Sequence, residues 1–158
     1  MNPHIQTKYV EPLTIAAFSA PAADASRQST GAVVQALFDQ VITQMESAAA
    51  DRTTPIARYV PAAGTPAVEV AAGYAIAGTV PGLSLSTLPA TEVASLIHHG
   101  PMNTISTAYQ ALTHWAESAG HSPTTSTWRE QYLEANGNDQ STWIVELQLE
   151  LPTTSTTP

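Results

Sequence analysis

Residues 143–151 alternate apolar and polar side chains with a period of two, which is the pattern of a β-strand with one face on a hydrophobic core. Every second residue from Trp143 to Leu151 is large and apolar, and the opposite face carries Ile144, Glu146, Gln148 and Glu150. An earlier segment, residues 66–74, shows the same alternation and carries Glu69. The chain is therefore predicted to contain two similar strands, each with a glutamate on the face away from the core.

The segments around these two strands follow the same order of elements. In the first half the patterns predict a strand, a helix and two further strands, at residues 12–19, 31–49, 56–61 and 68–77. In the second half they predict a connecting strand at 83–88 and then the same series. It consists of a strand at 92–98, a helix capped by Asn103 or Thr104 with its apolar stripe from Ile105 to Ala119, and strands at 128–133 and 143–151. Ser29 or Thr30 is predicted to cap the first helix, and Gly120 to follow the end of the second.

Several residues recur in the same order in both halves, which predicts an internal duplication. The matched pairs include Phe38 with Tyr109, Tyr59 with Tyr132, and Glu69 with Glu146. The predicted fold class is α+β, with tandem duplicated β-α-β-β modules. The predicted boundaries are an N-terminal tail at 1–11, a first module at 12–80, a second module at 81–152 and a disordered tail at 153–158.

The charge balance and the residue types exclude several classes of function. Five Lys and Arg against thirteen Asp and Glu give a net charge of −8, which disfavours direct binding to DNA or RNA. The chain has no cysteine and no metal-ligand spacing, so we expect no metal and no cofactor. It shows neither a signal peptide nor a long apolar run, so we expect a cytoplasmic protein that does not enter membranes.

A set of short motifs, taken together and in order, resembles the GyrI-like family over residues 14–152. The motifs are Leu88-Pro89-Ala90, Ile97-His98-His99-Gly100-Pro101, Ala108-Tyr109-Gln110-Ala111-Leu112 with Trp115, Glu130-Gln131-Tyr132-Leu133-Glu134, and Trp143-Ile144-Val145-Glu146-Leu147. Residues 55–59 and 68–70 match the first-half motifs of the family. Met102 departs from the pattern, because the family often has a tyrosine there.

The resemblance implies two β-α-β-β modules of the SHS2 type, related by pseudo-two-fold symmetry, with antiparallel sheets around a central cleft. It also implies binding of hydrophobic, often cationic, aromatic compounds by a glutamate on a central strand, as in the sensing domains of multidrug regulators. Glu146 matches that glutamate, and Glu69 matches its first-half counterpart. Only about eleven residues precede the first predicted strand, so we expect a stand-alone effector-binding domain without a DNA-binding segment.

The candidate site residues each have a structural alternative. Glu146 and Glu69 are predicted to line the cleft, although a strand glutamate can also lie on a solvent-exposed sheet face. Glu150, near the end of the strand, is expected on the solvent face. The pair His98-His99 cannot chelate one ion, because adjacent strand residues point to opposite faces.

Aromatic residues supply the remaining candidates. Trp128, Glu130 and Tyr132 share one side of their strand, where they would either form a ligand wall or pack in the core. Tyr59 inherits the same two alternatives through the duplication. Trp143 has the apolar parity of its strand and is expected in the core or at the rim of the cleft.

The family resemblance, taken together with these residues, implies three candidate functions. The first is binding of a hydrophobic, aromatic and in some cases cationic small molecule, for sensing or sequestration. The second, implied by stand-alone members of the family, is hydrolysis of reactive, cyclopropane-bearing small molecules, with Glu146 or Glu130 activating a water and Tyr132 donating a proton or holding the leaving oxygen. The third is a protein-binding role such as modulation of gyrase.

Overall fold

The structure is a computed structural model that describes residues 5–49, 53–62, 64–76, 78–123, 126–135 and 139–151. The predicted disordered tail at 153–158 lies outside the described residues. The chain forms two compact units, one of Leu13–Leu88 and one of Met1–Pro12 with Pro89–Pro158. Both units combine antiparallel strands with one long helix, which confirms the predicted α+β class.

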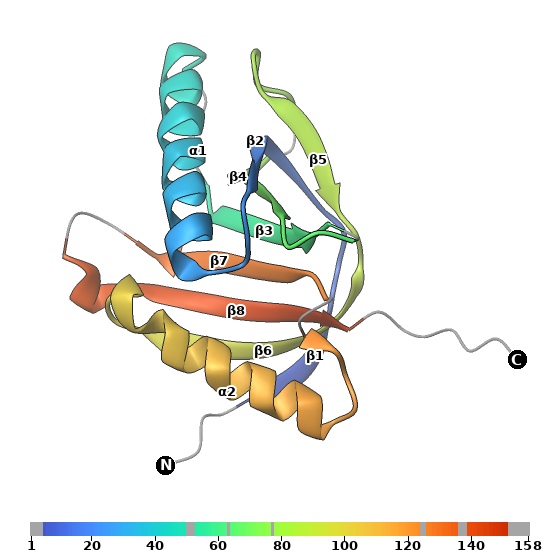
Figure 1. Ribbon diagram of the computed structural model, residues 1–158. Coiled ribbons are helices and arrows are strands. Elements are labelled where there is room, and N and C mark those ends of the chain that lie inside the picture. Colours follow the sequence, from blue (N-terminus) through green and yellow to red (C-terminus); the bar gives the residue numbers. More distant parts are fainter. Residues whose placement is uncertain are drawn as a thin grey trace, which may run out of the picture. The chain divides into compact units, whose positions relative to one another are not determined.

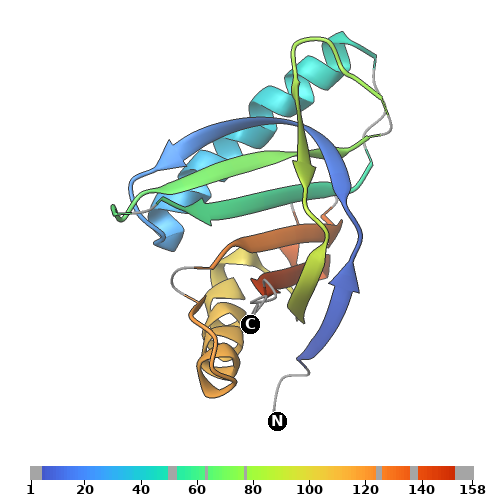
Figure 2. The same cartoon turned by 90° about the vertical axis from the view of Figure 1, so that its right-hand side faces the viewer.

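The unit Leu13–Leu88 pairs its strands in the order β5-β2-β4-β3, all antiparallel. Its elements are β2 (Leu13–Ala22), α1 (Arg27–Ser47), β3 (Pro55–Pro61), β4 (Val68–Ala75) and β5 (Ser84–Leu88). Helix α1 packs on the face of β2 and β4, which run side by side (Figure 1, Figure 2). The core between them contains Ala16, Val41, Met45, Tyr74 and Val80.

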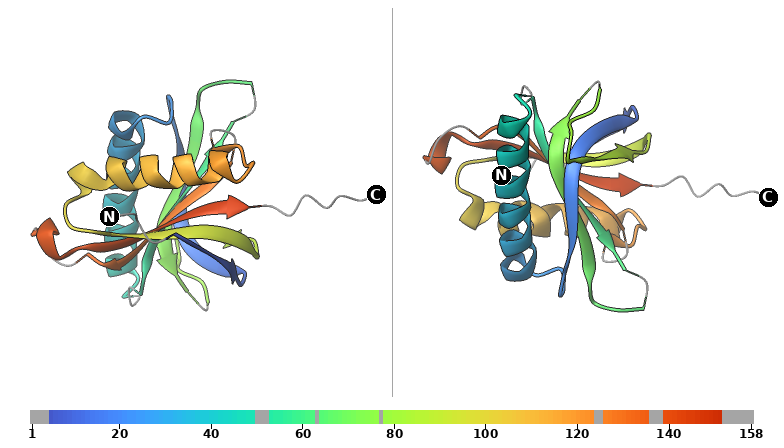
Figure 3. Two further views of the ribbon diagram at one scale, coloured as in Figure 1. Left: turned by 90° about the horizontal axis from the view of Figure 1, so that it is seen from below. Right: turned by 90° about the horizontal axis from the view of Figure 1, so that it is seen from above.

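The other unit pairs its strands in the order β1-β6-β8-β7, again all antiparallel. Its elements are β1 (Gln6–Val10), β6 (Thr91–His99), the 3-10 helix η1 (Met102–Thr104), α2 (Ile105–Ser118), β7 (Trp128–Glu134), the 3-10 helix η3 (Gln140–Thr142) and β8 (Ile144–Leu151). Helix α2 lies across β6 and β8 (Figure 3). Its buried side chains, Ile105, Ala108, Leu112 and Ala116, form the apolar stripe expected of an amphipathic helix.

The two units share their register as well as their strand order. Tyr59 pairs with Val70 in one unit, and Tyr132 pairs with Val145 in the other. When these tyrosines are matched, the paired strands of the two units also begin and end at or next to equivalent residues, down to Leu88 opposite Leu13 and Val10 opposite Thr91. An internal duplication would produce this agreement, and the duplication itself stays a prediction. The pairing also shows that the two halves of the sequence exchange their edge strands. Strand β1 directly precedes β2 in the chain but pairs with β6, and β5 directly precedes β6 but pairs with β2.

Two expectations about the N-terminal half are wrong. Residues 6–10, predicted to be a tail, form β1, an edge strand whose mostly exposed side chains give no apolar alternation. Helix α1 begins at Arg27, because Ser26 rather than Ser29 or Thr30 caps it and accepts a hydrogen bond from the Ser29 backbone N–H over 3.2 Å. The first turn of α1 is polar, so the apolar periodicity begins later than the helix does.

Three further features concern strand β8, the contact between β4 and β2, and the end of helix α2. Strand β8 was predicted to be half-buried, but all its residues from Val145 to Leu151 are buried, so both of its faces are covered. Strand β4 approaches β2 closely at Gly73, where a Cβ atom would lie 2.0 Å from the carbonyl oxygen of Ala16. Gly120 has a φ of 88° and directly follows Ala119, the C-cap residue of α2, as predicted for the residue after the helix cap.

Candidate functional site

Strand β8 separates two groups of polar side chains on the two faces of its sheet. Because side chains alternate along each strand, the pairing register assigns every residue to one face. The face away from α2 carries a row that we call the polar face, formed by Lys8, Ser95, Arg129, Gln131, Glu146, Gln148 and Glu150. The face toward α2 carries Trp128, Glu130 and Tyr132 beside the apolar residues of β8.

Glu146 lies at the middle of the polar face and is only 5% exposed. Its Oε2 atom accepts three hydrogen bonds, from Lys8 Nζ at 2.6 Å, Ser95 Oγ at 2.7 Å and Gln148 Nε2 at 3.1 Å. Its Oε1 atom has no hydrogen-bond partner in the described part of the chain. The carboxylate is thus held firmly through one oxygen, and the second oxygen is left to accept a hydrogen bond from another molecule.

The pKa of Glu146 is lower than its ordinary value of 4.5. Burial alone raises this pKa, since it penalises the charged form. The hydrogen bonds from Lys8, Ser95 and Gln148, together with the positive charge of Lys8, outweigh that effect. Glu146 is therefore an anion with a reduced affinity for protons.

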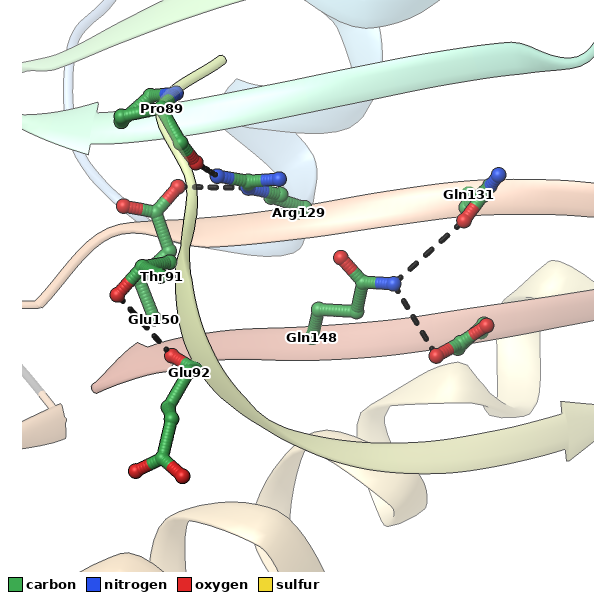
Figure 4. A network of polar contacts seen from close by, with 8 residues as sticks. Pro89, Thr91, Glu92, Arg129, Gln131, Gln148 and Glu150 are labelled. Atoms are coloured by element: carbon green, nitrogen blue, oxygen red, sulfur yellow. Dashed lines mark hydrogen bonds and ion pairs between the residues drawn. The ribbon is translucent and has the colours of Figure 1, made fainter. Parts of the chain in front are cut away.

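A second ion pair occupies the other end of the polar face. Arg129, 2% exposed, donates from Nε to Glu150 Oε2 over 2.7 Å and from a second guanidinium nitrogen to the carbonyl oxygen of Pro89 over 2.7 Å (Figure 4). Glu150 is buried, so the expectation that it lies on a solvent-exposed face is wrong. Its carboxylate can be buried because the positive charge of Arg129 compensates it. Gln148 lies between the two ion pairs and also bonds Gln131 at 3.5 Å (Figure 4).

Trp128, Glu130 and Tyr132 come together on the α2 side of the sheet. The hydroxyl groups of Tyr132 and of Tyr109 on α2 both donate to the Glu130 carboxylate, which is fully buried. The Tyr109 and Trp128 rings contact each other with centroids 5.0 Å apart. These contacts place the aromatic group in the packing under α2, with the sheet between it and Glu146. A role of Trp128, Glu130 and Tyr132 in ligand binding stays a prediction.

The first-half candidates are arranged differently from their second-half counterparts. Glu69 is exposed, whereas Glu146 is buried. In the shared register the position equivalent to Glu146 is Ala71, because Ala71 lies opposite Arg58 as Glu146 lies opposite Gln131. The matching of Glu69 with Glu146 is therefore two residues out of register, although both glutamates lie away from the helix of their unit. Tyr59 is buried on the α1 side.

Trp143 stands just before β8. Its carbonyl oxygen accepts the backbone N–H of Gly100 at 2.9 Å. Its indole Nε1 is buried and has no partner among the residues that the structure describes. The sequence made Trp143 a candidate for ligand binding, and that role stays a prediction. The unpaired indole N–H is the group through which Trp143 would donate a hydrogen bond to a ligand.

The residues that sequence analysis missed are the partners of the carboxylates. Lys8, Ser95, Gln148 and Arg129 follow no motif, and Lys8 lies in a segment predicted to be a tail. One signal was available: Lys8 is the only lysine of the chain, and a buried strand glutamate needs a cation or several donors. Within the described ranges, no group of three or more His, Asp or Glu side chains could hold a metal ion. No described helix is both long and apolar enough to cross a membrane.

Comparison with known proteins gives one family match. The GyrI-like small molecule binding domain matches residues 1–152 of the 158 residues. A comparison with curated proteins finds no match.

Solved structures share the fold at low sequence identity. The C-terminal domain of EcmrR is 20% identical with a TM-score of 0.67, over 95% of this chain and 98% of that one. SAV2435 bound to tetraphenylphosphonium is 8% identical with a TM-score of 0.73, over 95% of this chain and 94% of that one. A hydrolase encoded by lin2189 from Listeria innocua is 10% identical with a TM-score of 0.56, over 94% of this chain and 92% of that one. At these identities the likeness shows the fold alone.

Proposed function

Because the chain belongs to the GyrI-like small molecule binding domain family, we propose that it binds a hydrophobic, aromatic small molecule beside Glu146. The observation that carries this proposal is the Glu146 carboxylate, which is buried, anionic and bonded through Oε2 only. A carboxylate held in this way is positioned to accept a hydrogen bond from a ligand through Oε1 without rearrangement. The biological role is sensing or sequestration of drug-like compounds.

Apolar side chains next to Glu146 supply the surface that such a ligand would cover. Ile97 lies directly opposite Glu146 on β6 and is 40% exposed. Ile144 lies two residues before Glu146 on the same face and is half-buried. Covering these side chains provides the affinity, at about 25 cal/mol per Å² of apolar surface, while the carboxylate orients the ligand.

Tetraphenylphosphonium is a suitable first probe, because the structurally similar protein SAV2435 has been solved with it bound. We would measure the melting temperature of the wild type with this cation and with a panel of uncharged aromatic compounds. At least one compound is expected to raise the melting temperature of the wild type and to raise that of Glu146→Gln less. Glu92→Gln is the matched control, since Glu92 is an exposed carboxylate on the other face of the same sheet.

Two outcomes would overturn the proposal. The first is that no aromatic compound stabilises the wild type, and the second is that Glu146→Gln responds as strongly as the wild type. A Glu69→Gln variant in the same series tests the sequence-based prediction that Glu69 also contributes. Since Glu69 is exposed and out of register with Glu146, we expect its replacement to change the response less.

Hydrolysis is the second candidate, favoured by the structural likeness to the Listeria innocua hydrolase. Glu130 is fully buried and accepts hydrogen bonds from two tyrosine hydroxyls, so it cannot reach a water molecule. Glu146 has a free oxygen, but its lowered pKa makes it a weak general base. Binding is therefore the better supported function. Ligand turnover detected by mass spectrometry in the wild type and absent in Glu146→Gln would make hydrolysis the function instead.

A further inference from the structure

Lys8 is the only lysine of the chain, and it pairs with the buried Glu146. It lies on the edge strand β1, and its side chain is 41% exposed. Its Nζ atom lies 2.6 Å from Glu146 Oε2. The single lysine thus supplies the counter-ion of the carboxylate on which the proposed binding function rests.

This ion pair makes the polar face electrically neutral. Lys8 offsets Glu146, and Arg129 offsets Glu150, so the two cations and two anions of this face sum to zero. The whole chain, by contrast, carries a net charge of −8. A permanent cation placed beside Glu146 would meet the like charge of Lys8 as well as the carboxylate, and its attraction would be largely cancelled. To bind there through charge, it would have to displace Lys8.

The hydrogen bonds on Glu146 favour a different kind of ligand. Because Lys8, Ser95 and Gln148 all donate to Oε2, a ligand with an O–H or N–H group can donate to Oε1 without disturbing them. Tetraaryl cations carry no such donor. An uncharged aromatic compound with a donor would satisfy Oε1, cover Ile97 and leave the Lys8–Glu146 pair intact.

We propose that Lys8 determines the ligand specificity of this site: by neutralising Glu146 it selects uncharged aromatic ligands with an O–H or N–H donor over permanent cations. This inference rests on the proposed function and names the ligand class for the same site. It reverses the preference for cations that the family resemblance implies.

Two matched pairs of probes separate charge from hydrogen bonding. Tetraphenylphosphonium and tetraphenylborate have the same shape, opposite charges and no donor. Naphthol and methoxynaphthalene are both uncharged, and only naphthol has an O–H donor. Dissociation constants would be measured by calorimetry for the wild type, for Lys8→Met, which removes the charge, and for Lys8→Arg, which keeps it.

The wild type is expected to bind naphthol several times more tightly than methoxynaphthalene, and more tightly than tetraphenylphosphonium. Lys8→Met should bind tetraphenylphosphonium about tenfold more tightly than the wild type, and it should bind tetraphenylborate more weakly than the wild type. A tenfold change in affinity is the effect expected from one partly screened charge contact. Lys8→Arg should keep the wild-type order. If Lys8→Met folds poorly, acetylation of folded wild type can replace it, with reductive methylation, which keeps the charge, as the control.

The results that would overturn the inference differ from those that would overturn the proposed function. If tetraphenylphosphonium binds the wild type and Lys8→Met with equal affinity, or binds the wild type more tightly than naphthol does, Lys8 does not set the preference. The protein would then still be a binder of aromatic molecules. If none of the four probes binds any folded variant, the proposed function fails, and the inference fails with it.

Discussion

Arg129 on β7 donates to Glu150 on β8 over 2.7 Å, and both side chains are buried. Both charges are largely shielded from water, so removal of one partner leaves the other uncompensated. We therefore expect Arg129→Leu to lower the free energy of unfolding by about 3–5 kcal/mol. Urea unfolding followed by circular dichroism measures this loss.

The double variant Arg129→Leu/Glu150→Leu is the control for this pair. It removes both charges, so it should recover most of the stability lost in Arg129→Leu. If the double variant is as unstable as the single variant, the loss comes from packing or from the bond to Pro89 rather than from an unpaired carboxylate.

The approach of Gly73 to Ala16 gives a prediction about packing. A Cβ atom at Gly73 would lie 2.0 Å from the Ala16 carbonyl oxygen, so β2 and β4 would have to separate. Gly73→Ala should destabilise the protein by about 2 kcal/mol or more, as overpacked cores do. Thermal unfolding monitored by circular dichroism tests this.

Gly31→Ala is the matched comparison for that substitution. Gly31 lies inside α1, where an added Cβ atom meets nothing within 4 Å. There the same change should stabilise the protein by about 0.5–1 kcal/mol, because alanine favours the helix. Equal effects at the two glycines would contradict the close contact at Gly73.

The tyrosines that bond Glu130 give a third prediction. Tyr109→Phe and Tyr132→Phe each remove one hydroxyl donor from a carboxylate that is fully buried. Each is expected to lower the free energy of unfolding by about 1–3 kcal/mol. Tyr9→Phe serves as the control and should change stability little, since Tyr9 is exposed. A loss at Tyr9 as large as at the two buried tyrosines would argue against the Glu130 cluster.

The lowered pKa of Glu146 predicts a dependence of stability on pH. The unfolded state titrates at the ordinary value of 4.5 and the folded state below it. The stabilisation is therefore complete above the unfolded pKa and is lost as the pH falls from there through the folded pKa. Between neutral pH and about pH 3, the wild type should lose more stability than Glu146→Gln does.

Urea midpoints of both proteins across this range check that prediction. Asp24 and Asp139 also have lowered pKa values, through hydrogen bonds from Ser26 and Ser141, but they are present in both proteins and cancel in the comparison. Parallel pH profiles for the wild type and Glu146→Gln would show that Glu146 is not held as an anion by its partners.

The local patterns predicted most elements, because alternation and helical periodicity depend on nearby residues. The strands around Tyr59, Glu69 and Tyr132 lie close to where they were expected. The patterns could not show that both faces of β8 are buried, since a buried polar row and a solvent-exposed row alternate in the same way. That distinction depends on distant partners such as Arg129 and Lys8.

The candidate site shows the same limit. Glu146 was singled out from its strand and the family motif, and it does lie in a hydrogen-bonded network. Its partner Lys8 was missed because β1 is short, exposed and without alternation. The equivalence of Glu69 with Glu146 was read from residue identity, whereas the strand pairing assigns that place to Ala71.

The exchange of edge strands has a consequence for the order of events in folding. Strand β1 precedes the other described strands, but it pairs with β6, more than eighty residues later. An even longer stretch of chain separates Lys8 from its partner Glu146 on β8. Contacts between such distant residues form slowly, because a long loop must close first. During synthesis, Lys8 is therefore made well before Glu146, and the two meet only after β8 has been made.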